Sequence, residues 1–259
     1  MTGVGELDFL PIWAVFGLTF ALSIGATELG YRTGLHWQRL RPQEGDAAGG
    51  VMVGATLAML AFFLAFLVGM AVDRFDGRRA MVMDEANSIG TTWLRAGYLP
   101  DEYPGAIRPI LEQYTAQRLR LPDNIQRDDA LAQSTRLASE LWAQTEQLVR
   151  DYPNSESVSL FTSSVNDTID MGSKRAVAMA TWRIPGTIWL SIYVVALLTM
   201  MFVGIHGGIT KSRNVIEVLL LALVFAAVMN LIIDLDRPYD GMLQVSQEAL
   251  RQLQASFGH

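Results

Sequence analysis

The sequence predicts an all-α membrane protein. Four transmembrane helices form two hairpins, and a helical extramembrane domain is inserted between the second and third helices. Hydrophobic residues make up 51% of the 259 residues and charged residues only 18%, whereas a soluble domain carries about 25% charged residues. One long polar segment separates four apolar runs into two pairs, and this segment shows no strand-type alternation.

Each apolar run is long enough to cross a bilayer, for which about 20 apolar residues are needed. Residues 9–27, 47–72 and 184–205 contain no charged side chain, and residues 214–233 contain only Glu217. Short polar links join the first run to the second and the third to the fourth. The predicted parts are the hairpins at residues 1–72 and 184–235, the insert at residues 73–183 and a C-terminal tail at residues 236–259.

The insert is predicted to be helical. In "DALAQSTRLASELWAQTEQLVRDY", apolar residues recur at near-helical spacing between charged ones, which predicts an amphipathic helix. The second apolar run passes into "DRFDGRR" with Gly77 as the only breaker before Gly90. This second helix is therefore predicted to continue beyond the bilayer.

Composition excludes several functions. The chain has no cysteine, which excludes disulfides, thiolate catalysis and zinc-thiolate sites, and it has three histidines. A net charge of −6 argues against a nucleic-acid partner, because phosphate binding needs a basic surface. We find no G-x-S-x-G, H-E-x-x-H, G-x-G-x-x-G or phosphate-loop motif. The sequence therefore does not predict an enzyme.

Two stripes on the second helix are candidates for a pore lining. Apolar side chains at i, i+4 and i+8 share one face, and around a symmetric oligomer they would form stacked rings that gate by dewetting: Phe62, Phe66 and Met70. A polar stripe follows at Asp84, Ser88, Thr91 and Arg95, flanked by Glu85 and Thr92. The alternatives are ordinary packing or lipid contact for the first stripe and a solvated face for the second. A G-x-x-x-G pair, Gly50 and Gly54, would permit close helix approach.

Carboxylates gather at the predicted membrane boundary. Three follow the fourth run and two precede the third: Asp234, Asp236, Asp240, Asp167 and Asp170. Two interpretations stay open. The acids could hold a hard cation such as Ca²⁺, which takes oxygen ligands, or they could pair with nearby arginines: Arg74, Arg78, Arg79, Arg175 and Arg237. Two lone charges, Glu28 and Glu217, lie near the ends of the first and fourth helices.

The order of several motifs resembles the bestrophin-like family of bacterial membrane proteins. These motifs are "RFDGRR", "DEANSIGTTWLRAGYLP", "QYTAQRL", "SVNDTIDMGSKR" and "DLDRPYDG", and together they cover nearly the whole chain. The family name implies a more distant likeness to bestrophins. Those are homopentameric ion channels whose second helix lines an apolar neck, and the regulated animal members have an acidic Ca²⁺-binding segment after their fourth helix.

This resemblance implies a homo-oligomeric ion channel, expected to be a pentamer, in the bacterial cytoplasmic membrane, with lipid and further copies of the chain as partners. The alternative is a non-conducting interaction or sensing protein whose insert binds a partner or ligand. More lysine and arginine residues flank the insert and tail than lie in the links, which favours a cytoplasmic insert and cytoplasmic termini. The permeant ion stays open, because boundary carboxylates would favour cations and the nearby arginines anions.

Overall fold

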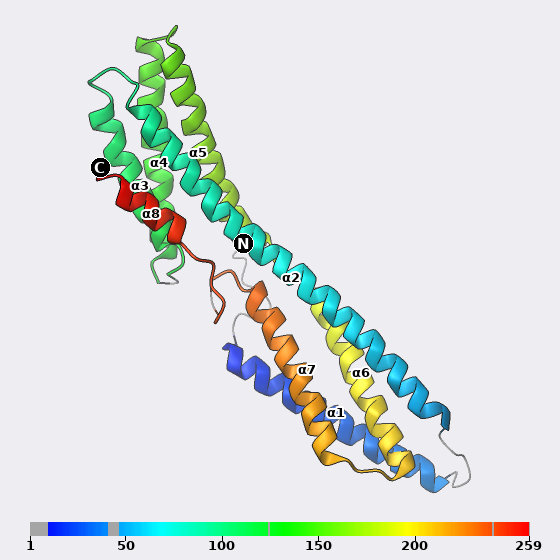
Figure 1. Cartoon of the computed structure of the whole chain (residues 1–259). Coiled ribbons are helices and arrows are strands. Elements are labelled where there is room, and N and C mark those ends of the chain that lie inside the picture. The colour runs from blue at the N-terminus through cyan, green and yellow to red at the C-terminus, as the bar shows by residue number, and fades with distance from the viewer. Residues whose placement is uncertain (1–9, 41–46, 124, 240, 259) are drawn as a thin grey trace. The chain divides into compact units, whose positions relative to one another are not determined.

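The computed structural model describes residues 10–40, 47–123, 125–239 and 241–258, and within them all regular secondary structure is helical. The helices are α1 (Ile12–Leu40), α2 (Ala47–Ala96), α3 (Pro104–Arg120), α4 (Arg127–Asp151), α5 (Glu156–Thr181), α6 (Gly186–Thr210), α7 (Val215–Asp236) and α8 (Glu248–Ser256) (Figure 1). Four helical stretches are long and apolar enough to cross a membrane: Ile12–Leu40, Gly49–Ala96, Glu156–Thr210 and Val215–Asp236. The prediction of an all-helical chain with four apolar spans is confirmed over these residues. The hairpin arrangement stays a prediction.

The chain divides into two compact units. The first, called here the membrane unit, comprises Met1–Arg74 and Arg183–Leu243, and the second, the polar unit, comprises Phe75–Trp182 and Gln244–His259. Helix α2 contributes its apolar part to the membrane unit and its polar part to the polar unit. The last residues of the chain therefore group with the polar unit, and the predicted division with residues 236–259 as a tail stays a prediction.

Within the membrane unit, α1 packs against α6 and α7 (Figure 1). The contact between α1 and α6 is close because glycines from both helices meet there. A Cβ atom at any of the four would overlap a backbone carbonyl oxygen of the facing helix: Gly30, Gly34, Gly204 and Gly208. Small residues spaced four apart let helix backbones approach in a membrane, where dispersion contacts drive association.

The expected G-x-x-x-G contact on α2 is different. A Cβ at Gly54 would have no neighbour within 4 Å, and a Cβ at Gly50 would meet only the imidazole of His206, at 3.5 Å. Neither glycine brings α2 against another backbone among the described residues. The small-residue packing in this unit is instead provided by the spacing of Gly204 and Gly208 on α6, within "GIHGG".

The polar unit has its own apolar core. It is formed by the second half of α2 together with α3, α4, α5 and α8, and Ile89, Leu111, Leu148 and Phe161 are fully enclosed. The predicted amphipathic helix is present as α4, which buries Leu141 and Leu148. Helix α8 packs against α3. Its Leu250 is fully buried, so the C-terminal segment is part of the core.

Candidate functional site

The apolar stripe on α2 is uncovered in the single chain. Phe62 and Phe66 are 68% and 62% exposed, while Met70 is half-buried. Large apolar side chains that no part of their own chain covers mark contacts with lipid or with another protein surface. This arrangement suits the proposed pore face and also suits lipid contact, so the role of the stripe stays a prediction.

The polar stripe lies in the polar unit. Asp84 and Thr91 are exposed, and Ser88 and Arg95 are half-buried. The Ser88 hydroxyl donates to the Glu85 carbonyl at 2.9 Å, and Arg95 Nη1 donates to the Leu160 carbonyl at 2.8 Å. Arg95 therefore joins α2 to α5, while the other side chains of the stripe leave a polar face open.

Glu85, which sequence reasoning placed only beside the stripe, is the centre of a buried ionic cluster. Its Oε2 accepts from Arg175 Nη1 at 2.5 Å, and its Oε1 pairs with Arg118 Nε. Arg175 Nη2 donates to Gln247 Oε1 at 2.7 Å. Because these residues come from α2, α3, α5 and the segment before α8, the cluster ties four parts of the polar unit together. We call these four residues the Glu85 cluster.

Hydroxyl groups extend this internal network. Thr92 Oγ1 lies 2.8 Å from both the Ser164 carbonyl oxygen and the Thr168 hydroxyl. Tyr114 lies beside the Glu85 cluster, since a Cβ at Gly172 would overlap the Tyr114 hydroxyl and would lie 3.4 Å from Glu85 Oε1. Burial raises the pKa of Tyr114 to about 12. Glycine is therefore required at position 172 for this packing.

The predicted acidic cluster is divided between the two units. Asp234 and Asp236 are buried in the membrane unit, Asp167 and Asp170 are exposed in the polar unit, and Asp240 lies outside the described residues. Over the described part of the chain, no group of three acidic or histidine side chains is placed to hold a metal ion.

The two buried aspartates, Asp234 and Asp236, both accept hydrogen bonds from backbone amides. Asp234 accepts from the amides of Met242 and Leu243 at 2.8 and 3.1 Å. Asp236 accepts from the Ile184 amide at 2.9 Å and from Arg183 Nε at 3.1 Å. A carboxylate that accepts amide and guanidinium hydrogen bonds is well satisfied when buried. The Asp236 contacts hold the residues just before α6 at the end of α7, and the Asp234 contacts hold the segment that follows α7.

Among the five arginines predicted to pair with these aspartates, three make contacts with other described residues, and the predicted pairing as a whole stays a prediction. Arg175 pairs with Glu85, and Arg78 Nη1 and Arg237 Nη2 donate to the carbonyls of Trp182 and Leu10, at 3.2 and 2.7 Å. Arg79 is exposed and Arg74 is half-buried. Among the described residues, Asp236 pairs with Arg183, which is not one of the five predicted arginines.

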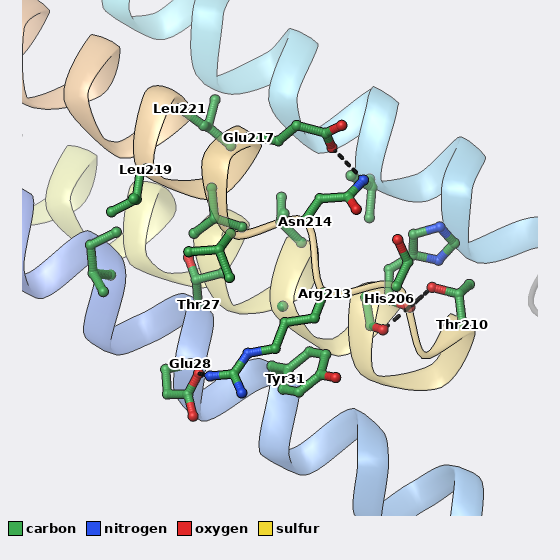
Figure 2. Close-up of a pocket in the computed structure, with 18 of the residues that line it drawn as sticks. Thr27, Glu28, Tyr31, His206, Thr210, Arg213, Asn214, Glu217, Leu219 and Leu221 are labelled. Atoms are coloured by element: carbon green, nitrogen blue, oxygen red, sulfur yellow. Dashed lines mark hydrogen bonds and ion pairs between the residues drawn. The ribbon is translucent and has the colours of Figure 1, made fainter.

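The two lone membrane charges line one cavity of about 560 Å³ in the membrane unit, at the α6–α7 link (Figure 2). Glu28 accepts from Arg213 Nη2 at 3.2 Å and from Arg32 Nε at 2.9 Å, and Asn214 Nδ2 donates to Glu217 at 2.9 Å. The link turns sharply because Lys211 adopts a left-handed conformation with φ 58°. Glu28 and Glu217 therefore each accept a hydrogen bond from a residue of the link.

Tyr31 and His206 complete the polar side of this cavity (Figure 2). The Arg213 guanidinium lies 5.3 Å from the centre of the Tyr31 ring, within the range of a cation–π contact. Arg213 and Glu28 are partly exposed, so their ion pair is screened and contributes little stability. The cavity offers apolar walls and paired charges at one end.

The fold and these contacts define a helical membrane protein with four apolar spans and a polar helical unit. The sequence matches the Bestrophin-like domain over residues 14–250, so the chain belongs to the bestrophin-like family. No curated protein matches the sequence.

Solved structures share the fold. A bacterial bestrophin homologue from Klebsiella pneumoniae is 14% identical, with a TM-score of 0.65 over 95% of this chain and 97% of that chain. A single-substitution variant of that homologue is 16% identical, with a TM-score of 0.65 and the same coverage. A further structure, described as a membrane protein, is 15% identical with a TM-score of 0.64. At these identities the likeness establishes the fold.

Proposed function

We propose that copies of this chain assemble into an ion channel whose pore is lined by α2. The observation that carries the proposal is the apolar stripe of Phe62, Phe66 and Met70, in which the rest of the membrane unit leaves both phenylalanines uncovered and Met70 half-buried. Membership of the bestrophin-like family supports the same assignment. Five copies is the number that the likeness to bestrophins implies.

The two α2 stripes also agree in helical phase. Counted along the sequence from Phe62 to Arg95, all seven candidate residues fall within about 80° of the circumference of an α-helix. A pore formed by the apolar stripe would therefore continue along polar side chains. The ring of phenylalanines would form the narrowest, dewetted part. The charges of Asp84 and Arg95 would set the electrostatic potential that an ion meets beyond this constriction.

The membrane itself and further copies of the chain are the partners in this proposal. We propose no enzymatic role, because the sequence contains none of the catalytic motifs that were sought. The bacterial cytoplasmic membrane is the expected location, with the polar unit in the cytoplasm. The permeant ion is left to measurement.

Ion flux into proteoliposomes tests the proposal. The purified wild-type chain is expected to carry flux, and Phe66→Ala is expected to increase it, because removing an aromatic ring widens and wets the neck. Val68→Ala is the matched control, since residue 68 lies about 200° around the helix from residue 66. The proposal is contradicted if no ion of either sign crosses, or if the two variants change the flux equally.

A further inference from the structure

The polar unit contains a cavity that the pore proposal does not use. It has a volume of about 670 Å³ and lies among α3, α4 and α5. Its lining combines apolar side chains such as Trp142 and Ile169 with hydroxyl groups such as that of Ser173. Among the described residues, Arg118 is the only charged side chain that lines it. Cavities of this size with apolar walls and a few polar groups are typical of small-molecule sites.

The charge behind the cavity is unbalanced. The Glu85 cluster contains the guanidinium groups of Arg118 and Arg175 but only one carboxylate, and all three charged side chains are at most 2% exposed. Within the described residues, neither arginine has a second acidic partner. A buried charge without a counter-charge is costly. The cluster therefore carries an excess of one positive charge.

Two hydrogen-bond donors remain for a negative charge. Arg118 uses Nε for Glu85 and Nη2 for the Gly172 carbonyl at 2.9 Å, and over the described residues its Nη1 has no acceptor. Tyr114 also lines the cavity, and its hydroxyl donates to no described protein atom. Because the pKa of Tyr114 is raised to about 12 by burial, this hydroxyl keeps its proton at neutral pH. Both donors lie on α3, four residues apart, and so share one face.

We propose that this cavity binds a small organic anion of single negative charge. Its charged group would accept from Arg118 Nη1 and from the Tyr114 hydroxyl, and its apolar part would lie against Trp142 and Ile169. One negative charge balances the excess of the Glu85 cluster. The part of the lining that the structure describes contains no carboxylate that would repel it. The apolar walls require a ligand larger than an inorganic ion.

This inference does not depend on conduction, because binding is measured on protein in detergent. Calorimetric titration of the full chain with benzoate is compared with titration using benzyl alcohol, which has the same ring but no charge. We expect benzoate to bind about tenfold tighter or more, the ratio that one hydrogen bond to a charged group supports. Titration with chloride tests whether the ring is needed, and chloride is expected to bind more weakly than benzoate.

Two variants locate the site. Ser173→Phe places a large side chain in the cavity from an exposed position, and should weaken benzoate binding about tenfold or more, since it occludes the apolar wall. Ser163→Phe, at an exposed position of α5 outside the cavity lining, is the matched control and should bind like the wild type. Arg118→Gln should abolish the preference for benzoate over benzyl alcohol if the variant folds.

Three outcomes would overturn the inference. They are equal affinity for benzoate and benzyl alcohol, absence of benzoate binding to the wild-type chain, and unchanged benzoate binding in Ser173→Phe. Chloride that binds as tightly as benzoate would contradict the organic part of the assignment. Ser173 is not one of the residues of the Glu85 cluster. The Ser173→Phe variant therefore tests the proposed site even if Arg118→Gln fails to fold.

Discussion

Glu85 on α2 and Arg175 on α5 form a fully buried ion pair of 2.5 Å, although they are 90 positions apart in the sequence. With Arg118, this pair holds the polar part of α2 against the helices that follow it. The arrangement fixes the rotation of α2 about its own axis within the polar unit. The stripe of Asp84, Ser88 and Thr91 therefore faces away from the core.

Replacement of Glu85 should destabilise the polar unit strongly. Glu85→Gln leaves two buried guanidinium groups without a carboxylate, and breaking a buried pair in this way costs about 3–5 kcal/mol. A large fall in the thermal unfolding midpoint of the purified protein is expected. Glu248→Gln, which removes an exposed partner of Arg251, is the control and should leave the midpoint nearly unchanged. Equal midpoints for the two variants would contradict the central role of Glu85.

Asp236 should matter for stability more than for ion selectivity. Asp236→Asn weakens the contacts to the Ile184 amide and to Arg183, at an expected cost of about 1.5–3 kcal/mol for a hydrogen bond to a charged group. Asp73→Asn, at an exposed position, is the matched control. Thermal unfolding and the reversal potential are measured on both variants. A shifted reversal potential with unchanged stability would favour a metal or pore role for Asp236.

The glycine contact between α1 and α6 should tolerate no side chain. Gly204→Ala places a Cβ against the Thr27 carbonyl, so the helices must separate and lose the packing that holds them in the bilayer. We expect a loss of about 1–3 kcal/mol, the usual cost of overpacking. Gly54→Ala, which has open space around its Cβ, should be neutral or slightly stabilising. Both variants are purified in detergent, and their thermal unfolding midpoints are compared with that of the wild type.

The hydrogen bond from Tyr103 to Asp151 predicts a pH-dependent contribution to stability. It measures 2.5 Å, and together with Gln147 it lowers the pKa of Asp151 below its ordinary value of 3.8. The stabilisation is therefore present above pH 3.8 and is lost as the pH falls through the lowered pKa. The same bond raises the pKa of Tyr103 to about 12, so the stabilisation also persists through neutral pH.

Tyr103→Phe should consequently reduce the unfolding midpoint at neutral pH, with a difference from the wild type that shrinks on acidification. Tyr98→Phe, at an exposed position, is the control and should follow the wild type at every pH. Thermal unfolding between neutral and acidic pH gives both curves. A difference that grows as the pH falls would contradict the assigned direction.

Local sequence patterns were enough to predict the spans and the continuation of α2. Apolarity over about 20 residues is a strong signal, and the stretch after Val72 contains only one helix breaker before Gly90. The amphipathic pattern around Leu141 and Leu148 likewise predicted α4, because a helix that buries one face carries apolar residues at helical spacing.

The ionic core was missed because its members come from distant parts of the chain. Arg118 and Arg175 lie within two of the quoted family motifs, yet nothing local shows that both contact Glu85. One signal was available. Glu85 shares its helix face with the apolar residues Val82 and Ile89, which predicts burial and therefore a cationic partner. The split of the acidic cluster depends on tertiary structure and could not be read from spacing.

The central claim is that α2 lines an ion pathway, and cysteine accessibility tests it most directly. The chain has no cysteine, so single variants carry one reactive thiol. In planar bilayers, Phe66→Cys should conduct, and a charged methanethiosulfonate reagent should change its current. Val68→Cys should conduct without responding to the reagent. Absence of current in both variants and in the wild type, or a response confined to Val68→Cys, would contradict the account.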